Sequence, residues 1–419
     1  MSLTPTLAES AVRLGTWLPF AQAAKQLAHF VHTQLSEATL TRLTERAGAA
    51  YAAVQDAQAA QVRADPGPLM AGPPLQQVSV DGAFVPLVHK GWVEAKSLAI
   101  GTVQPPVRLA DGRVEVHTTH LSYFSRVADC HTFTDLATGE IVRRGTLTAG
   151  RVCGVVDGAL WEQDFLAVHC PGAVHILDWP HAVGYLANVA HALSGVDTPA
   201  SAAWLAAQRE TLLHGDPQRV LAKLRGLAEE LTLQAGEGPP PPALAVLDET
   251  LTYLTARLAQ IQYAAFRARG YPIGSGAVES ANKLVVEFRL KGAGMHWALA
   301  HVNPLLALRG MACSDRWEEA WPQLARQWRA EARSQVLEQR RRRQATQQAA
   351  RDDAAGAANP ADPVADAPPS GARPTPAAPA SVLDRPRTPP RRSSRPAPNH
   401  PWRAALQTRR AAPAPPPAI

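Results

Sequence analysis

The stretch RVCGVVDGALWEQDFLAVHCPGAVHILDWP, residues 151–180, decides the fold of this chain. It contains two short apolar runs rich in β-branched residues, at 151–156 and 173–177. The segment between them, 159–169, has a composition that can form a helix. A strand, a helix and a second strand in this order predict two parallel strands joined by a right-handed crossover.

Three further strands are predicted upstream of this unit. Residues 76–81 alternate between apolar and polar side chains, and 92–102 and 113–123 are also strand candidates, whereas 129–144 is predicted to be a helix. Three strands followed by alternating helix and strand are typical of a mixed α/β fold.

The N-terminal region, residues 1–65, is predicted to be helical. Its two helices are separated by a short break at 32–35, and Ser36 is a good N-cap for the second. This arrangement resembles a helix-turn-helix, in which Arg42 and Arg46 would face DNA. An ordinary helical hairpin fits the same residues equally well.

Changes in composition set the remaining boundaries. A proline-rich linker is predicted at 66–75, followed by the first part of the α/β domain at 76–184, a helical insertion at 185–268 and the last part of the α/β domain at 269–335. The segment 344–419 is dominated by Ala, Pro, Arg and Ser, so we expect a disordered tail that cannot bury enough apolar surface to order itself.

The overall charge points to a polyanionic partner. The formal net charge is +6, which favours nucleic acid, although a basic tail on an unrelated enzyme would give the same value. No CxxC pair and no apolar run of membrane-spanning length are present, and the N-terminus does not read as a signal peptide. We therefore expect a cytoplasmic, nucleoid-associated protein with no membrane partner.

Carboxylates occupy positions where α/β proteins usually bind their ligands. Asp81 follows a strand in VSVDG, Asp157 follows another in CGVVDG, and Glu279 opens a helix in YPIGSGAVESANK. Ligands bind beyond the carboxyl ends of strands, so the three side chains would meet in one crevice. Taken singly, each Asp-Gly pair is more typical of a turn.

Oxygen ligands of this kind suit hard cations, so we expect two Mg²⁺ (or Mn²⁺) ions held by these carboxylates. Two such ions activate the nucleophile and stabilise the leaving group in phosphodiester cleavage. Asp178 and His181, in HILDWPHA, form a second group after the neighbouring strand. Asp178 is an alternative second metal ligand, but a supporting role for both residues is favoured, with Asp178 orienting His181.

The helix that carries Glu279 has two predicted faces. One is an apolar stripe that should pack on the core, made of Val278, Ala281, Val285 and Phe288. The basic residues Lys283, Arg289 and Lys291 are expected to hold DNA phosphates. A simple i, i+4 surface pair between Glu279 and Lys283 is the competing interpretation.

Several motifs together resemble the ISKra family of insertion-sequence transposases. The matching stretches lie between about residues 11 and 320 and include VSVDGAFVPLVHKGWVEAKSLAIGTV, VCGVVDGALW, AVHILDWPHAVGYL, YPIGSGAVESANK and RLKGAGMHWALAHVNPLLALRGMACSDRW. The resemblance implies a ribonuclease-H-like catalytic domain with an all-helical insertion before the last carboxylate. It places the catalytic Asp-Asp-Glu triad on Asp81, Asp157 and Glu279, and a supporting Asp-x-x-His element on Asp178 and His181.

The expected function is that of a DDE-type DNA transposase. Its partners would be double-stranded DNA, as element ends and target, and further copies of the chain in a synaptic complex. Family members usually have a longer N-terminal region, often with zinc-binding cysteine pairs, and this chain contains no such pairs. Two alternatives therefore remain open at this point, a decayed non-catalytic DNA-binding protein and a nuclease of the same fold.

Overall fold

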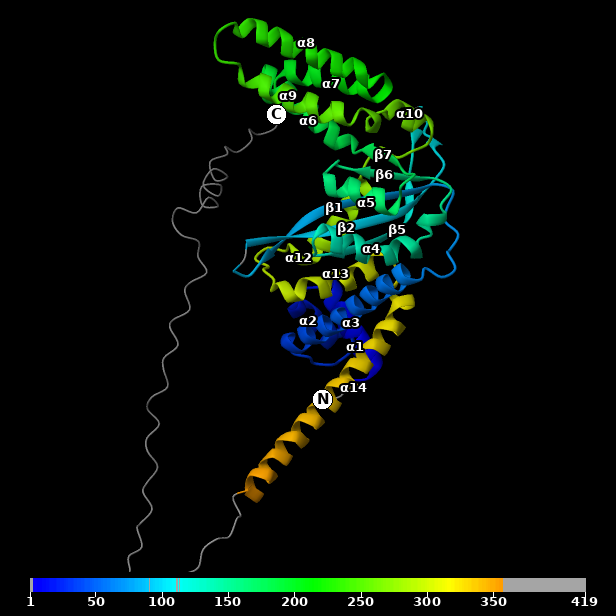
Figure 1. Cartoon of the computed structure of the whole chain (residues 1–419), viewed down its shortest axis with the longest axis vertical. Coiled ribbons are helices and arrows are strands. Elements are labelled where there is room, and N and C mark those ends of the chain that lie inside the picture. The colour runs from blue at the N-terminus through cyan, green and yellow to red at the C-terminus, as the bar shows by residue number, and fades with distance from the viewer. Residues whose placement is uncertain (1–2, 90, 111, 113, 357–419) are drawn as a thin grey trace, which may run out of the picture. The chain divides into compact units, whose positions relative to one another are not determined.

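A five-stranded mixed sheet organises the fold (Figure 1). The computed structural model describes residues 3–89, 91–110, 112 and 114–356. The strands are ordered β5-β2-β1-β6-β7, with bounds β1 Gln76–Leu87, β2 Gly91–Val103, β5 Thr118–Arg126, β6 Val152–Val156 and β7 Val174–Leu177. The pairs β1/β2 and β2/β5 are antiparallel, and β1/β6 and β6/β7 are parallel. The fold is therefore mixed α/β, as the sequence predicted.

The predicted strand–helix–strand unit is confirmed. Helix α5 (Leu160–His169) connects β6 to β7, and the two strands pair in parallel from Cys153/Val174 to Val156/Leu177. Helix α4 (Cys130–Arg143) and the short helix η1 (Thr146–Thr148) precede β6.

Strand β1 is longer than the sequence indicated. We expected Asp81 to end this strand, but β1 continues to Leu87 and pairs with β2 along its whole length. Asp81 and Gly82 remain extended because Ser97 and Lys96 of β2 lie opposite them in the ladder. Cross-strand pairing thus overrides the turn preference of the Asp-Gly pair.

Each face of the sheet is covered by a different set of helices. Val80 and Leu98 point to the face that packs against Phe133 of α4 and Phe165 of α5. Val85 points to the opposite face, where the residues that pack on it come from helices α11 (Gly276–Ala281), η3 (Asn282–Glu287) and α13 (Leu299–Cys313). Side chains of odd number in β1, Asp81 included, therefore share the α11 face.

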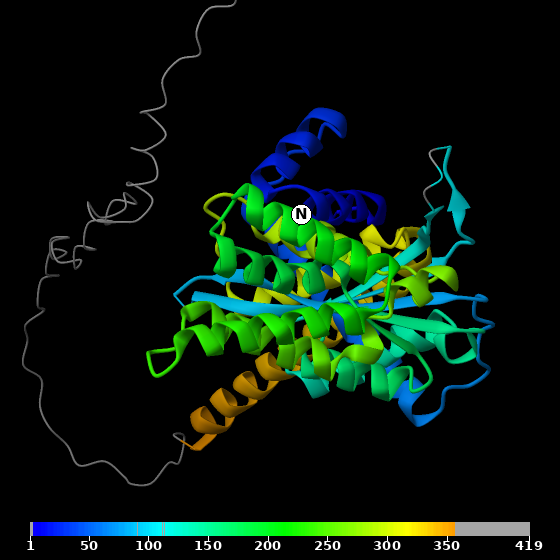
Figure 2. The same cartoon turned by 90° about the horizontal axis from the view of Figure 1, so that it is seen from above.

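The chain between β7 and α11 is helical. Between β7 and α11 the chain forms α6 (Trp179–Ser194), α7 (Pro199–His214), α8 (Pro217–Ala235), α9 (Pro242–Ala256), η2 (Leu258–Gln260) and α10 (Tyr263–Ala268). These helices pack on one another and on the apolar side chains of β6 and β7, and Figure 1 shows α6–α9 gathered beyond the β7 edge. Figure 2 shows the molecule from the side of these helices. In this view the short ribbon formed by β3 (Val107–Arg108) and β4 (Val114–Glu115) extends away from the sheet.

The N-terminal helices are part of the same packing unit as the sheet. They are α1 (Pro5–Trp17), α2 (Phe20–Phe30) and α3 (Glu37–Ala64), and Ser36 caps α3 by accepting a hydrogen bond from the Thr39 amide at 3.2 Å. Helix α3 packs against α13 and α4, and Gly48 lies so close to Pro304 that a Cβ there would overlap its backbone. Residues Met1–Ala350 form one compact unit.

The C-terminal part begins differently from the prediction. The short helix α12 (Phe288–Leu290) precedes α13, and the last helix, α14, spans Trp317–Gly356. Residues 344–356, which we expected to be disordered, are therefore helical. Their Ala, Gln and Arg residues have high helix propensity, which outweighs their low hydrophobicity. The rest of the predicted tail, 357–419, lies outside the described residues.

None of the helices in the part of the chain that the structure describes is both long and apolar enough to span a bilayer.

Candidate functional site

Three aspartates lie in or directly after neighbouring parallel strands. Val78 of β1 is opposite Gly154 of β6, and Asp81 and Asp157 each follow three residues later along these strands. Val156 is opposite Leu177 of β7, and Asp157 and Asp178 are the next residues of the two chains. The carboxyl ends of β6 and β7 thus bring these side chains to one edge of the sheet, on the face covered by α11.

Both carboxylate oxygens of Asp178 accept hydrogen bonds from backbone amides. Only 3% of the residue is exposed. Its Oδ1 accepts a hydrogen bond from the Ser275 amide at 2.7 Å, and its Oδ2 accepts one from the His181 amide at 3.0 Å, which caps helix α6. The residue holds the start of α6 and the segment before α11 in place, which fits the supporting role predicted for it.

Asp157 is the more accessible of the two strand-end aspartates. Its side chain is 38% exposed, and its Oδ2 lies 3.5 Å from Nδ1 of His181. Burial raises the pKa of Asp157, the His181 charge acts against this, and repulsion from Asp178 and Glu279 adds to the increase. His181 therefore contacts Asp157 through its ring, while Asp178 fixes its backbone.

Asp81 is oriented by two donors. Its Oδ1 accepts a hydrogen bond from the Gly82 amide at 2.6 Å, and its Oδ2 accepts one from Nδ2 of Asn282 at 2.7 Å. Burial raises the pKa of Asp81 to about 6, against the Gly82 hydrogen bond, and repulsion from Asp157 and Glu279 contributes. A cation beside Asp81 and Asp157 would relieve this repulsion.

Glu279 lies on α11, above the same edge of the sheet. Its side chain is 45% exposed and makes an ion pair with Lys283 at 3.5 Å. Its charge acts on both Asp81 and Asp157, so the three predicted ligands are electrostatic neighbours. Within the described residues, however, no group of three or more His, Cys, Asp or Glu side chains is arranged closely enough to hold a metal ion.

A π-helical turn changes the predicted face of the Glu279 helix. Val278 and Val285 are buried as expected, but Phe288 is 64% exposed. Residues Asn282–Glu287 form the π-helix η3, whose wider turn rotates the residues that follow, so Val286 and Leu290 take the core positions instead.

Arg289 cannot act as the predicted phosphate contact in this conformation. It is 2% exposed, its Nε donates to the Gly15 carbonyl at 3.2 Å, and its guanidinium lies over the rings of Phe20 and Trp297. The reason is again the π-helical turn, which directs this side chain toward α1 and α2. Burial and the nearby Arg309 lower the pKa of Arg289 to about 10.

The other predicted DNA contacts are on the surface. Lys283 has a side-chain exposure of 71%, whereas Lys291 is more covered and pairs with Glu287 at 2.6 Å. Arg42 and Arg46 are exposed on α3, where the Arg42 Nε donates to the Ala38 carbonyl at 3.2 Å.

Sequence reasoning missed Glu162 and Asn282. Glu162, on α5, is 3% exposed and accepts the amides of Gly158 at 2.9 Å and Ala159 at 3.1 Å. Burial, together with repulsion from Asp157 and Asp81, raises its pKa to about 8. An acidic residue at the third position of a helix that follows a turn is a capping signal, and it could have drawn attention to Glu162. Nothing in the sequence separates Asn282 from other polar helix residues.

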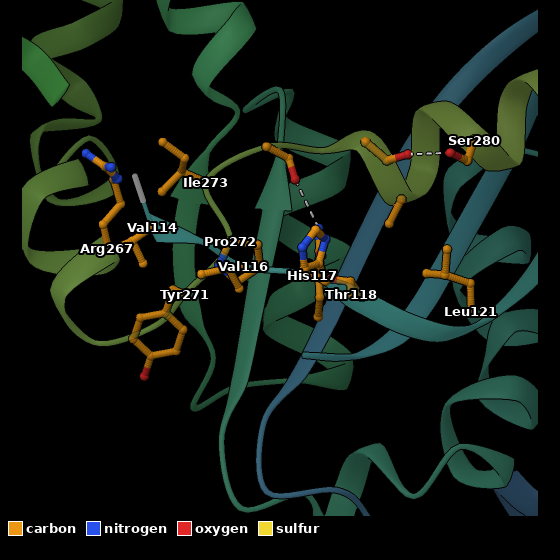
Figure 3. Close-up of a pocket in the computed structure, with 14 residues that line it drawn as sticks. Val114, Val116, His117, Thr118, Leu121, Arg267, Tyr271, Pro272, Ile273 and Ser280 are labelled. Atoms are coloured by element: carbon orange, nitrogen blue, oxygen red, sulfur yellow. Dashed lines mark hydrogen bonds between the residues drawn. The ribbon is translucent and has the colours of Figure 1, made fainter. Parts of the chain in front are cut away.

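A pocket of about 470 Å³ lies beside α11, between the segment 271–280 and the start of β5 (Figure 3). Gln77 reaches into this region and donates to the Gly274 carbonyl at 3.2 Å, and Ser280 lines the wall next to Glu279. None of the three predicted ligands lines this pocket. It is therefore a neighbour of the carboxylate group and not part of it.

The chain matches no protein-family model, and no curated protein matches it.

Proposed function

We propose that this chain is a DNA transposase of the DDE type, which cuts DNA strands and joins them to a target in a reaction that depends on Mg²⁺ or Mn²⁺. One observation carries the proposal. Asp81 lies in β1, Asp157 directly follows the parallel neighbour β6, and the charges of Asp157 and of Glu279, on helix α11, both act on Asp81.

The fold supports the proposal. The order β5-β2-β1-β6-β7, with the first three strands antiparallel and the last two parallel to β1, agrees with the ribonuclease-H-like sheet that the resemblance to ISKra transposases implies. The helices α6–α10 separate β7 from α11, where that resemblance implies an all-helical insertion. Fold alone does not assign chemistry, so the carboxylates carry more weight.

The carboxylates suit divalent cations of the hard type. Asp81, Asp157 and Glu279 offer only oxygen atoms, and burial, with added repulsion between these carboxylates, raises the pKa values of the two aspartates. Two bound ions supply stabilisation of charge on the attacking and leaving oxygens of a phosphodiester. Glu279, whose side chain is 45% exposed and pairs with Lys283, would have to move closer to the aspartates to complete such a site.

The chain's own groups would orient the carboxylates and the DNA. Asn282 holds Asp81, and the backbone bonds of Asp178 fix the segment that carries His181. Lys283 would bind a phosphate once Glu279 turns away from it toward the ions. The exposed Arg42 and Arg46 would add contacts to the duplex.

The proposed partners are double-stranded DNA and other copies of the chain. Element ends and target must be held together for joining, so we propose a homo-oligomeric synaptic complex. The site of action would be the bacterial cytoplasm, at the nucleoid.

A strand-transfer assay tests the proposal. Labelled duplexes from the DNA on either side of the gene are incubated with the protein, a target duplex and Mg²⁺ or Mn²⁺. We expect nicks that leave 3′-hydroxyl ends, followed by products joined to the target. Asp81→Asn should bind the same duplexes with unchanged affinity but neither cut nor join them.

Two other results would support the alternative functions. Metal-dependent cutting without joined products would favour a nuclease of the same fold. Duplex binding without cutting in either metal would favour a decayed, non-catalytic DNA-binding protein.

A further inference from the structure

The turn that follows β6, residues 157–159, is held by several hydrogen bonds from side chains. Glu162 accepts the amides of Gly158 and Ala159. The Gly158 carbonyl accepts a bond from Nε2 of Gln163 at 3.1 Å. Turns at strand ends are usually less constrained than this, so the position of Asp157, the first residue of the turn, is strongly fixed.

Two of the restraints come from the helical insertion, nearly a hundred residues further along the chain. The Tyr253 hydroxyl, on α9, donates to the carbonyl of Asp157 itself. Arg257, just after α9, donates from Nη2 to the Gly158 carbonyl at 2.6 Å. Its guanidinium also lies over the Tyr253 ring, 3.8 Å from the ring centre.

Gly158 makes this close approach possible. Its φ is +86°, a value that other residues rarely adopt. A Cβ at this position would lie 2.6 Å from Nε of Arg257 and 2.8 Å from the Tyr253 hydroxyl. A glycine is therefore required at this position, both for its positive φ and because Tyr253 and Arg257 leave no space for a Cβ.

The Tyr253 ring is not free to stack on a nucleic-acid base. Tyr185 of α6 stacks on it with ring centres 4.1 Å apart and planes at 13°, and Arg257 lies over the same ring. These contacts hold the ring and direct its hydroxyl toward the turn. The geometry favours a role in positioning over direct contact with substrate.

We propose that Tyr253 and Arg257 are positioning residues, through which the helical insertion holds Asp157 in the place where it binds metal. This inference rests on the proposed function, because it assigns metal binding to Asp157. Tyr253 bonds the peptide group of Asp157, so losing the hydroxyl would let the Cα–Cβ direction of that aspartate vary. The site would then bind its ions more weakly without losing any ligand.

Tyr253→Phe tests the inference, because it removes one hydroxyl and keeps the stacked ring. We expect the Mn²⁺ concentration for half-maximal cleavage to rise about tenfold, within the range typical of lost outer-sphere partners, and the rate to recover at saturating Mn²⁺. Affinity for duplex DNA should not change. Arg257→Lys, which retains a donor, should give a smaller shift than Arg257→Met.

Tyr263→Phe is the matched control. Its buried hydroxyl donates to the Leu177 carbonyl at 3.0 Å, at the end of the neighbouring strand, and does not reach the Asp157 turn. The variant should lose a similar amount of stability and keep the Mn²⁺ requirement of the wild type. Equal shifts in both variants, or a Tyr253→Phe rate that falls equally at all Mn²⁺ concentrations, would overturn the inference.

Hydrogen exchange separates this inference from the proposed function. Tyr253→Phe should speed amide exchange in the peptide that covers 157–159, whether or not the protein cuts DNA, and Tyr263→Phe should not. An unchanged rate of amide exchange in Tyr253→Phe would show that Tyr253 does not hold the turn at 157–159, even if the enzyme is active. If the wild type neither cleaves DNA nor binds Mn²⁺ by calorimetric titration, both the proposed function and the metal-positioning role fail. Faster amide exchange in Tyr253→Phe would then still show that Tyr253 holds the turn at 157–159.

Discussion

Asp157→Asn is expected to reduce strand cleavage by at least about a thousandfold, since a lost metal ligand removes several kcal/mol of transition-state stabilisation. The change leaves volume and fold nearly intact, because the Asp157 side chain is 38% exposed and its Oδ2 lies 3.5 Å from Nδ1 of His181. Initial rates of nicking at saturating DNA measure the effect.

Asp178→Asn is the informative control for that experiment. This neighbouring carboxylate accepts two backbone amides, and an asparagine oxygen can replace only part of this, so we expect a loss of about 1–3 kcal/mol in unfolding free energy. Cleavage by the folded protein should remain within about tenfold of the wild type. The reverse pattern, an active Asp157→Asn and an inactive but folded Asp178→Asn, would show that Asp178 is the ligand.

Glu140→Gln is expected to give the largest loss of stability, about 3–5 kcal/mol, because it leaves two arginines beside an uncharged buried partner. Glu140 of α4 is 7% exposed, accepts hydrogen bonds from Arg143, and pairs with Arg316 at 3.4 Å just before α14. Urea unfolding at pH 7 measures the change.

Glu319→Gln is its matched control, since Glu319 pairs with the same Arg316 at 3.0 Å but has a side chain that is 58% exposed. Such surface pairs contribute little, so the loss should stay below about 1 kcal/mol. Equal losses in the two variants would mean that burial of Glu140 is unimportant.

The pH dependence of the Glu140 effect follows from the direction of its shift. Burial raises the pKa of Glu140, but the hydrogen bond and charge of Arg143 and the charge of Arg316 outweigh it, and the net pKa lies below the ordinary value of 4.5. The stability that the charged form contributes is therefore complete above about pH 4.5 and is lost as pH falls through the folded pKa. The difference between wild type and Glu140→Gln should shrink in that acid range.

Local signals predicted those elements whose boundaries have a chemical cause close in sequence. Ser36 caps α3, and Asp129 caps α4 by accepting the Thr132 amide at 2.9 Å. The short apolar runs before Asp157 and Asp178 form the strands β6 and β7, as predicted. The same local reasoning placed Glu279 correctly at the start of a helix.

The errors arose where distant parts of the chain decide the outcome. The pairing of β1 with β2 keeps Asp81 within a strand, and the π-helical turn after Ala281 exposes Phe288 and buries Arg289. Helical periodicity assumes 3.6 residues per turn, so a single wider turn misplaces everything after it. The contact of Tyr253 with Asp157 depends on the folding of the insertion over β6, which no local pattern encodes.

Anomalous diffraction from crystals of the protein soaked with Mn²⁺ in the presence of bound DNA tests the central claim most directly. We expect manganese peaks coordinated by carboxylate oxygens of Asp81, Asp157 and Glu279, with Glu279 released from Lys283. Manganese bound elsewhere beside cleavable DNA, with these three carboxylates uncoordinated, would contradict it.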